Sequence, residues 1–182
     1  MNILRNIILV GFMGAGKSTI GKGLAAKIKY KYFDVDKWIE KKNRKNIVNI
    51  FKEKGEKYFR KQEEKALEWL KNKEGYVVST GGGMWINELN RNKLLKMGLC
   101  IWLKISPETS FSRVKNKLYE RPLLLRQKQP LEHIKKLISS RNKLYGLAHL
   151  TVNTDQKEPK EIIDEIVELL KSKNDQNDKR KT

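Results

Sequence analysis

The feature that most constrains the fold is a glycine-rich segment near the N-terminus. Gly11–Thr19 reads GFMGAGKST and follows the apolar run Ile7–Val10. It matches G-x-x-x-x-G-K-[ST], a pattern in which backbone N–H groups cradle the phosphates of a nucleoside triphosphate. Ile20, Leu24 and Ile28 then recur every four residues, which indicates a helix. The sequence therefore predicts a phosphate-binding loop (a P-loop) between a strand and a helix.

Two side chains in this loop have expected roles. Lys17 is placed to reach the β- and γ-phosphates, and the Ser18 hydroxyl is placed to ligate Mg²⁺. A nucleoside triphosphate and Mg²⁺ are therefore the expected ligands, but the loop alone does not say what the phosphate is used for.

The length of 182 residues fits one domain. No membrane helix is expected, because the sequence has no stretch of about 20 apolar residues. The N-terminus lacks the pattern of a secretory signal peptide. The single cysteine, Cys100, lies in an apolar run and is expected to be a buried thiol. These features favour a cytoplasmic location.

The formal net charge of +19 raises the question of a nucleic-acid partner. The lysines are spread along the whole chain, and the sequence has no platform of aromatic and arginine residues of the kind that binds RNA. A solvated lysine-rich surface is the preferred interpretation, so nucleic acid is not expected as a partner. Such a surface would still attract anionic substrates.

Short apolar strands alternate with helical patterns, which predicts an α/β fold with a parallel sheet covered on both faces. Two helices are expected to meet near Gly55, and an amphipathic helix to begin at Pro159. The polar segment Ser172–Thr182 is expected to be a disordered tail, and three leucines after Pro122 a mobile flap. The expected strands are Ile7–Val10, Lys31–Val35, Tyr76–Thr80, Leu99–Ile105 and Leu150–Asn153.

The rest of the sequence favours a kinase of small molecules over other P-loop proteins. No Asn-Lys pair continues into the Asn-Lys-x-Asp motif that reads guanine, and the strand Tyr76–Thr80 does not end in aspartate. The acidic pair nearest a strand end is Asp34 and Asp36. Strand alternation would turn both to one side, where one could help hold Mg²⁺ through water and the other meet an acceptor hydroxyl. The simpler interpretation is that Asp36 caps a helix, a role that it could serve at the same time.

Two further groups indicate an anionic acceptor. Gly81, Gly82 and Gly83 follow a strand, where close backbone approach to a ligand is preferred to a simple turn. Arg60 lies three residues before Glu63, as a surface ion pair or with its guanidinium in a cleft, and Arg141 is a second candidate. Two arginines that converge on one ligand favour a carboxylate.

Taken together, the chain resembles shikimate kinases over its whole length before the tail. The resemblance implies a three-layer α/β/α P-loop kinase fold with a central five-stranded parallel sheet. It also implies one domain over residues 1–171, with a helical substrate-binding region at about 34–63 and a mobile lid at about 112–128. The motifs that carry it are Gly11–Thr19, Asp34-Val35-Asp36, Phe59-Arg60 with Glu63, Gly81–Gly83, Arg121-Pro122-Leu123-Leu124, and Arg141 with Leu144, Tyr145 and Ala148.

The resemblance implies ATP- and Mg²⁺-dependent phosphorylation of the 3-hydroxyl of shikimate by a cytoplasmic monomer, on the pathway to chorismate and aromatic amino acids. Lys17, Asp36 and Arg121 would be catalytic. Ser18 would bind Mg²⁺ directly and Asp34 through water. Shikimate would contact Asp36, Arg60, Gly82 and Arg141, and ATP would contact Gly14, Ala15, Gly16, Lys17, Ser18, Thr19, Arg121 and, at the adenine, Gln156.

Two alternatives stay open on the sequence. One is another small-metabolite kinase of the same fold, such as one that acts on gluconate. The other is a P-loop module that binds nucleotide or nucleic acid without catalysis. The second leaves the aspartate pair, the glycine triplet and both arginines without a role.

Overall fold

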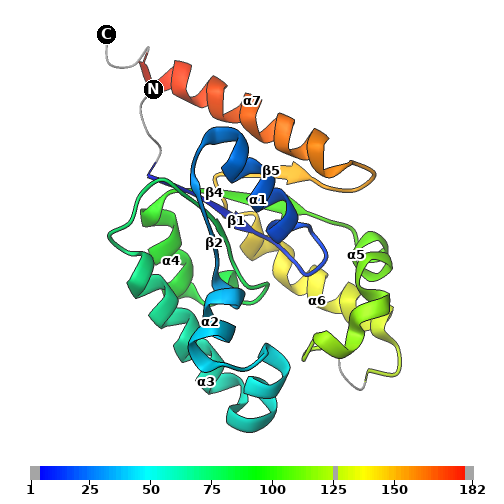
Figure 1. Cartoon of the computed structure of the whole chain (residues 1–182). Coiled ribbons are helices and arrows are strands. Elements are labelled where there is room, and N and C mark those ends of the chain that lie inside the picture. Colours follow the sequence, from blue (N-terminus) through cyan, green and yellow to red (C-terminus); the bar gives the residue numbers. More distant parts are fainter. Residues whose placement is uncertain (1–4, 125–126, 179–182) are drawn as a thin grey trace.

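The computed structural model describes residues 5–124 and 127–178, which form a five-stranded sheet in the order β2-β3-β1-β4-β5 (Figure 1). The described strands pair in parallel throughout. The predicted α/β fold with a parallel sheet is therefore confirmed. The strands are β1 (Asn6–Val10), β2 (Lys31–Asp34), β3 (Tyr76–Ser79), β4 (Leu99–Lys104) and β5 (Leu150–Asn153).

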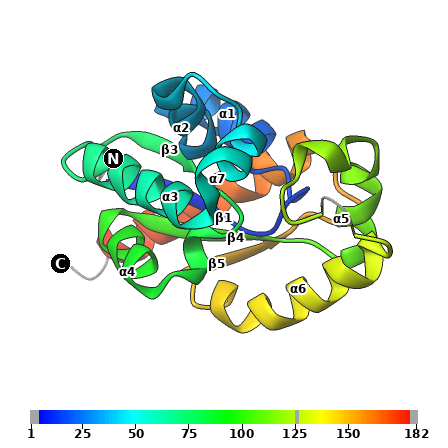
Figure 2. The ribbon, with the colours of Figure 1, turned by 90° about the horizontal axis from the view of Figure 1, so that it is seen from below.

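Helices cover both faces of the sheet and complete three layers. Helices α1 and α7 pack together on one face, and α4 and α6 lie on the other (Figures 1 and 2). The helices are α1 (Lys17–Ile28), α2 (Val35–Asn43), α3 (Ile47–Leu70), α4 (Glu88–Met97), α5 (Pro107–Val114), α6 (Pro130–Tyr145) and α7 (Pro159–Asp178), with the 3-10 helices η1 (Met84–Ile86) and η2 (Lys115–Glu120). Among the residues that the structure describes, no helix combines the length and the apolar composition needed to cross a membrane.

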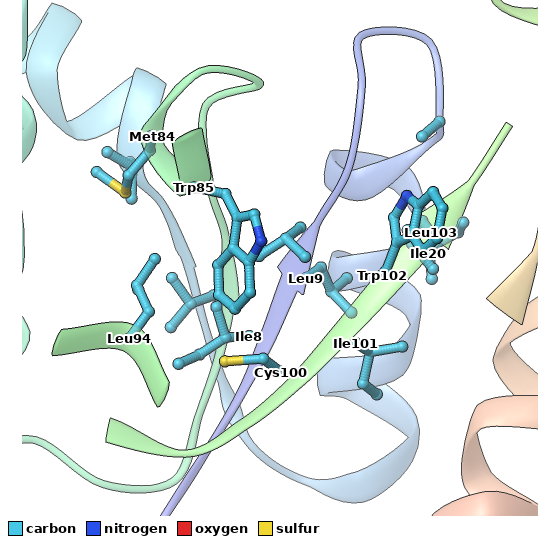
Figure 3. Close-up of a cluster of buried hydrophobic side chains, with 14 of the residues drawn as sticks. Ile8, Leu9, Ile20, Met84, Trp85, Leu94, Cys100, Ile101, Trp102 and Leu103 are labelled. Carbon is cyan, nitrogen blue, oxygen red and sulfur yellow. The ribbon is translucent and has the colours of Figure 1, made fainter. Parts of the chain in front are cut away.

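The core lies on both sides of β1 and β4. Ile8 is paired with Cys100, and Figure 3 shows both beside Trp85 and Leu94. All five residues of β1 are buried, as expected for the central strand of a sheet with two covered faces. Cys100 is fully buried, so the prediction of a core thiol is confirmed.

Two local predictions about the first half of the chain have different outcomes. The break near Gly55 is confirmed, because this residue leaves the helical conformation inside α3 with φ 74° and ψ 172°. Strand β2 ends one residue earlier than predicted, since Asp34 accepts a hydrogen bond from the Lys37 backbone N–H at 3.1 Å and so caps α2. The strand-alternation argument for the two aspartates was therefore wrong: Asp36 lies in the first turn of a helix.

The predicted disordered tail over 172–182 is contradicted over 172–178, because α7 continues to Asp178. The buried Ile162 and Ile166 anchor this helix, and once a helix is anchored each added residue costs little. Residues 179–182 lie outside the described residues. Leu124, expected in a flap, packs into the core with 2% of its surface exposed, whereas Leu125, and with it part of the predicted lid, lies outside the described residues.

Candidate active site

The candidate site lies where β1, β2 and β3 end. Because these strands are neighbours and parallel, the segments that follow them meet at one edge of the sheet. Together with residues that follow β4 and β5, these segments surround a cavity of about 500 Å³, called here the P-loop cavity. Its lining residues are Met13, Gly14, Gly16, Lys17, Ser18, Thr19, Ile20, Asp34, Asp36, Thr80, Gly82, Arg113, Val114, Arg121, Lys157, Glu158, Pro159 and Ile162.

The backbone of the loop requires glycine where it turns. Gly14 and Gly16 have φ values of 78° and 88°, in the left-handed region that glycine adopts without strain. Gly16 is the N-cap of α1, so the N-terminus of that helix and its positive dipole end face the cavity. Ala15 is fully buried and is not among the described lining residues. Its backbone N–H donates to the Phe12 carbonyl at 3.3 Å.

Two backbone carbonyls at the start of the P-loop bind the ammonium group of Lys17. Its Nζ donates to the oxygens of Gly11 at 2.8 Å and Phe12 at 2.9 Å. Desolvation lowers the pKa of Lys17 to about 8, against the opposing effect of Asp36. The ammonium group is therefore poorly hydrated, and a phosphate oxygen would gain strongly by binding it.

Ser18 and Asp34 supply adjacent oxygen ligands. The Ser18 hydroxyl donates to Asp34 Oδ2 at 2.8 Å. A hydroxyl and a carboxylate are hard ligands that suit Mg²⁺, which commonly takes its other ligands from phosphates and water. The described residues contain no group of three His, Cys, Asp or Glu side chains that could hold a metal ion alone. The pair therefore fits a metal that arrives with a nucleotide.

A second cavity of about 100 Å³, called here the arginine cavity, adjoins the first. The two cavities share Met13, Asp36, Gly82 and Arg121. A molecule in the arginine cavity would thus lie against the phosphate end of the P-loop cavity. The remaining lining residues are Ile47, Phe51, Phe59, Arg60, Glu63, Gly81, Gly83, Glu120, Pro122, Leu123 and Arg141.

Arg60 reaches this cavity on the second half of α3. Its guanidinium donates to Glu63 at 2.9 Å and to Glu56 at 2.7 Å. The Glu63 side chain is fully buried, and burial raises its pKa to about 7 despite the neighbouring arginine. A Cβ at Gly83 would lie 2.8 Å from both terminal nitrogens of Arg60, so a side chain there would displace the guanidinium from this position.

Asp36 lies at the boundary between the cavities. Its Oδ1 is buried, and no described residue donates a hydrogen bond to it. Burial, and next the charge of Asp34, raise the pKa of Asp36 to about 6. A Cβ at Gly81 would lie 2.8 Å from this oxygen and 3.2 Å from Glu63 Oε1. Asp36 is thus a carboxylate with a free acceptor atom and raised basicity.

Gly82 and Arg141 form the opposite wall. The Gly82 carbonyl accepts hydrogen bonds from the Tyr145 hydroxyl at 2.6 Å and from Arg141 Nη1 at 3.4 Å. The Arg141 guanidinium also lies over the Phe12 ring, 5.7 Å from its centroid. Arg60 and Arg141 therefore line one small cavity, although 81 residues separate them in the sequence.

Arg121 follows η2 and lines both cavities. Its backbone N–H donates to the Leu118 carbonyl at 3.0 Å, while its Nε is buried without a partner among the described residues. The guanidinium therefore has unused donors where the two cavities meet.

One predicted residue lies apart, and another site residue was missed. Gln156 is exposed and does not line the P-loop cavity within the described chain, whereas the next three residues do.

Arg113 was not predicted. It donates to the carbonyls of Gly14 at 3.1 Å and Thr154 at 2.9 Å and so joins the loops after β1 and β5. No local pattern marks Arg113, because its role depends on the packing of α5.

Both the sequence and the structure match known proteins of one family. The sequence model described as shikimate kinase matches residues 13–171. A shikimate kinase from a Sulfurihydrogenibium species is 48% identical over 92% of this chain and 99% of its own length. One from Persephonella marina is 44% identical over 90% and 98%. Among solved structures, shikimate kinase from Acinetobacter baumannii in complex with shikimate superposes with a TM-score of 0.88, at 34% identity over 93% of this chain and 94% of that one.

Proposed function

Because this chain belongs to the shikimate kinase family, we propose that it transfers the γ-phosphoryl group of ATP to the 3-hydroxyl of shikimate, giving shikimate 3-phosphate and ADP. The observation that carries this proposal is the shared wall of the two cavities. A small acceptor beside Asp36 would lie next to phosphates held by the P-loop. Phosphoryl transfer depends mainly on such alignment.

The arginine cavity supports a carboxylate-bearing acceptor. Arg60 and Arg141 both line it, and guanidinium groups bind carboxylates through paired hydrogen bonds. Arg60 is already oriented by Glu56 and Glu63, so little side-chain freedom is lost on binding. We assign the shikimate carboxylate to this pair and its ring hydroxyls to Asp36 and the backbone of Gly82.

Asp36 is the proposed base or orienting group. The acceptor oxygen attacks the γ-phosphorus, the bond from that phosphorus to the β,γ-bridging oxygen breaks, and the hydroxyl proton passes to Asp36. A carboxylate with a pKa raised to about 6 is ionised at neutral pH yet more basic than an ordinary aspartate.

Positive charge balances the charge that develops on the phosphoryl oxygens. Lys17, at the start of α1, and Arg121, after η2, both line the P-loop cavity and can supply this charge. Mg²⁺, when bound with ATP, adds further charge neutralisation, and Ser18 would ligate it with Asp34 in its water shell. Residues 112–128 are the proposed lid, which would exclude water as a competing acceptor.

The test is an ADP-release assay with ATP, Mg²⁺ and one acceptor at a time. Shikimate should give rapid, stoichiometric ADP release that is lost with EDTA, while gluconate and buffer should give only background. Faster release with gluconate would indicate the related metabolite kinase, and release independent of any acceptor would refute a metabolite kinase. The adenine contact of Gln156, the monomeric state and the cytoplasmic location stay predictions.

A further inference from the structure

A tyrosine outside the predicted motifs reaches the metal side of the candidate site. The Tyr32 hydroxyl, on β2, lies 2.9 Å from Asp34 Oδ2 and 3.1 Å from Ser79 Oγ. Ser79 Oγ in turn donates to the Lys17 carbonyl at 2.8 Å. The phenol therefore joins β2, the end of β3 and the first turn of α1, three elements that surround the P-loop cavity.

The helix above is adapted to this tyrosine. Gly21 lies inside α1, where glycine weakens a helix relative to other residues. A Cβ at this position would lie 2.8 Å from the Tyr32 ring and 2.8 Å from Ser79 Oγ. Both contacts are too short for real atoms, so a glycine in α1 is required for the ring to pass beneath the helix.

The hydrogen bonds of Asp34 show what the phenol contributes. Oδ1 accepts from the Lys37 backbone N–H at 3.1 Å, and Oδ2 accepts from the Ser18 hydroxyl at 2.8 Å as well as from Tyr32. The phenol O–H is a hydrogen-bond donor and the ionised carboxylate is only an acceptor, so the shared proton belongs to Tyr32. Donors on both oxygens fix the rotation of the carboxylate.

We propose that Tyr32 is a positioning residue for the phosphoryl transfer, whose hydroxyl holds Asp34 in the orientation that serves the Mg²⁺ bound with ATP. This inference rests on the proposed function. Asp34 would act on the metal through water, and Tyr32 acts on Asp34. Partners that orient metal ligands from behind commonly affect metal affinity.

The first test separates metal-supported binding from nucleotide binding as such. The dissociation constant of a non-hydrolysable ATP analogue is measured with Mg²⁺ and with EDTA, for wild type, Tyr32→Phe and Tyr58→Phe. The control is matched, because the Tyr58 hydroxyl donates to Asn43 Oδ1 at 2.7 Å, away from both cavities. Tyr32→Phe should weaken binding about tenfold with Mg²⁺, the lower end of effects on outer metal shells, and leave binding in EDTA unchanged.

Each other outcome overturns the inference. If Tyr32→Phe weakened analogue binding equally with Mg²⁺ and with EDTA, the hydroxyl would support the conformation of the P-loop rather than the metal site. Unchanged or tighter binding with Mg²⁺ would remove the positioning role altogether. A double-mutant cycle adds a second criterion: in an Asp34→Asn background, Tyr32→Phe should have no further effect on Mg²⁺-supported binding, and a full additive loss would contradict the proposed connection.

The kinetic test depends on the proposed function and can fail separately from the binding test. Tyr32→Phe should raise the Mg²⁺ concentration that gives half-maximal shikimate phosphorylation, and saturating Mg²⁺ should restore most of kcat. If the wild-type protein does not phosphorylate shikimate, the proposed function fails, while the binding comparison still judges Tyr32. If the wild type is active and the Mg²⁺ dependence of Tyr32→Phe matches it, only the inference on Tyr32 fails.

Discussion

At the scale of single residues, the glycine triplet makes room for the protein's own charged groups. Side chains at Gly81 and Gly83 would collide with Asp36 and Arg60, respectively, whereas a Cβ at Gly82 would meet only ordinary contacts. The sequence suggested close approach of a ligand at all three positions. Two of the three glycines instead allow a carboxylate and a guanidinium to reach the cavities, which gathers opposite charges in a small volume.

The first prediction concerns Asp36. Asp36→Asn should abolish phosphoryl transfer in single-turnover experiments, because the amide cannot accept the hydroxyl proton. The folded protein raises the pKa of this carboxyl, so it disfavours the ionised form at neutral pH. The neutral amide should therefore leave the Tm unchanged or higher. Near-normal turnover in this variant would exclude Asp36 as the base.

The second prediction concerns pH. Asp36 must be ionised to act, so kcat/KM for shikimate at saturating ATP and Mg²⁺ should fall as the pH drops through about 6. Stability should behave differently. The pKa values of Asp36 and Glu63 are raised to about 6 and about 7, so the folded state holds these protons more tightly than the unfolded chain. The contribution of these two carboxyl groups to the free energy of unfolding is therefore greatest at low pH, and it is lost as the pH rises through those pKa values. Activity that disappears only together with the folded state, followed by circular dichroism, would contradict this separation.

The third prediction concerns Arg60. Arg60→Ala should weaken shikimate binding by about 1.5–3 kcal/mol, the range for a hydrogen bond to a charged group, while ATP binding changes little. The variant also leaves the buried Glu63 without its cation, so the Tm should fall. Lys61→Ala, the exposed next residue, is the matched control and should do neither. An effect on ATP affinity alone, measured by titration calorimetry, would mean that the carboxylate site is wrongly assigned.

At the scale of elements, the break in α3 shapes the arginine cavity. Ile47 and Phe51 line it from before Gly55, and Phe59, Arg60 and Glu63 line it from after. A straight helix could not present residues this far apart along its axis to one small volume, since each residue advances about 1.5 Å. The angle at Gly55 therefore sets the distance between the apolar and charged walls.

The fourth prediction tests this break. At Gly55, φ is 74° and ψ is 172°, a conformation that only glycine adopts readily, and within the described chain nothing lies within 4 Å of an added Cβ. Gly55→Ala should cost about 1–3 kcal/mol of stability through backbone strain alone and should raise the KM for shikimate. Gly75→Ala is the control, because Gly75 also has φ 74° and open space but lies before β3. A raised shikimate KM in both variants, or in neither, would show that the break in α3 does not determine substrate binding.

The sequence predicted those elements whose signal is local. The P-loop is contiguous, and β5 was predicted with its observed ends, Leu150–Asn153. One end of each of β1, β2, β3 and β4 was predicted wrongly by one residue. Strand β2 ends at Asp34 rather than at Val35, because Asp34 caps the helix that follows. The prediction failed at Ser172, because composition does not reveal that a helix is already anchored.

Arg113 could not be predicted, since its partners Gly14 and Thr154 are 99 and 41 residues away. Tyr32 lies two residues from Asp34, but the position of its ring also depends on Ser79, 47 residues away.

At the scale of the whole molecule, the excess of basic groups acts at a distance. The formal net charge is +19, and both proposed substrates are anions. The fifth prediction is that kcat/KM for shikimate falls as potassium chloride is raised toward physiological ionic strength, where the screening length is about 8 Å, while kcat stays constant. An uncharged osmolyte at matched osmolarity is the control. A kcat/KM independent of salt would leave the basic surface without a role in substrate capture.

The order of the strands also determines when the protein can become active as it folds. The P-loop follows β1, which pairs with β3 some 70 residues later and with β4 some 92 residues later. Asp34 ends the edge strand β2, which joins the sheet only through β3, and Asp36 lies in the helix that follows it. Contacts so distant along the chain form slowly. The segments that form the site come together only after β3 and β4 have paired with β1. Regain of catalysis during refolding would therefore report completion of the sheet, and a partly folded chain would not consume ATP on shikimate.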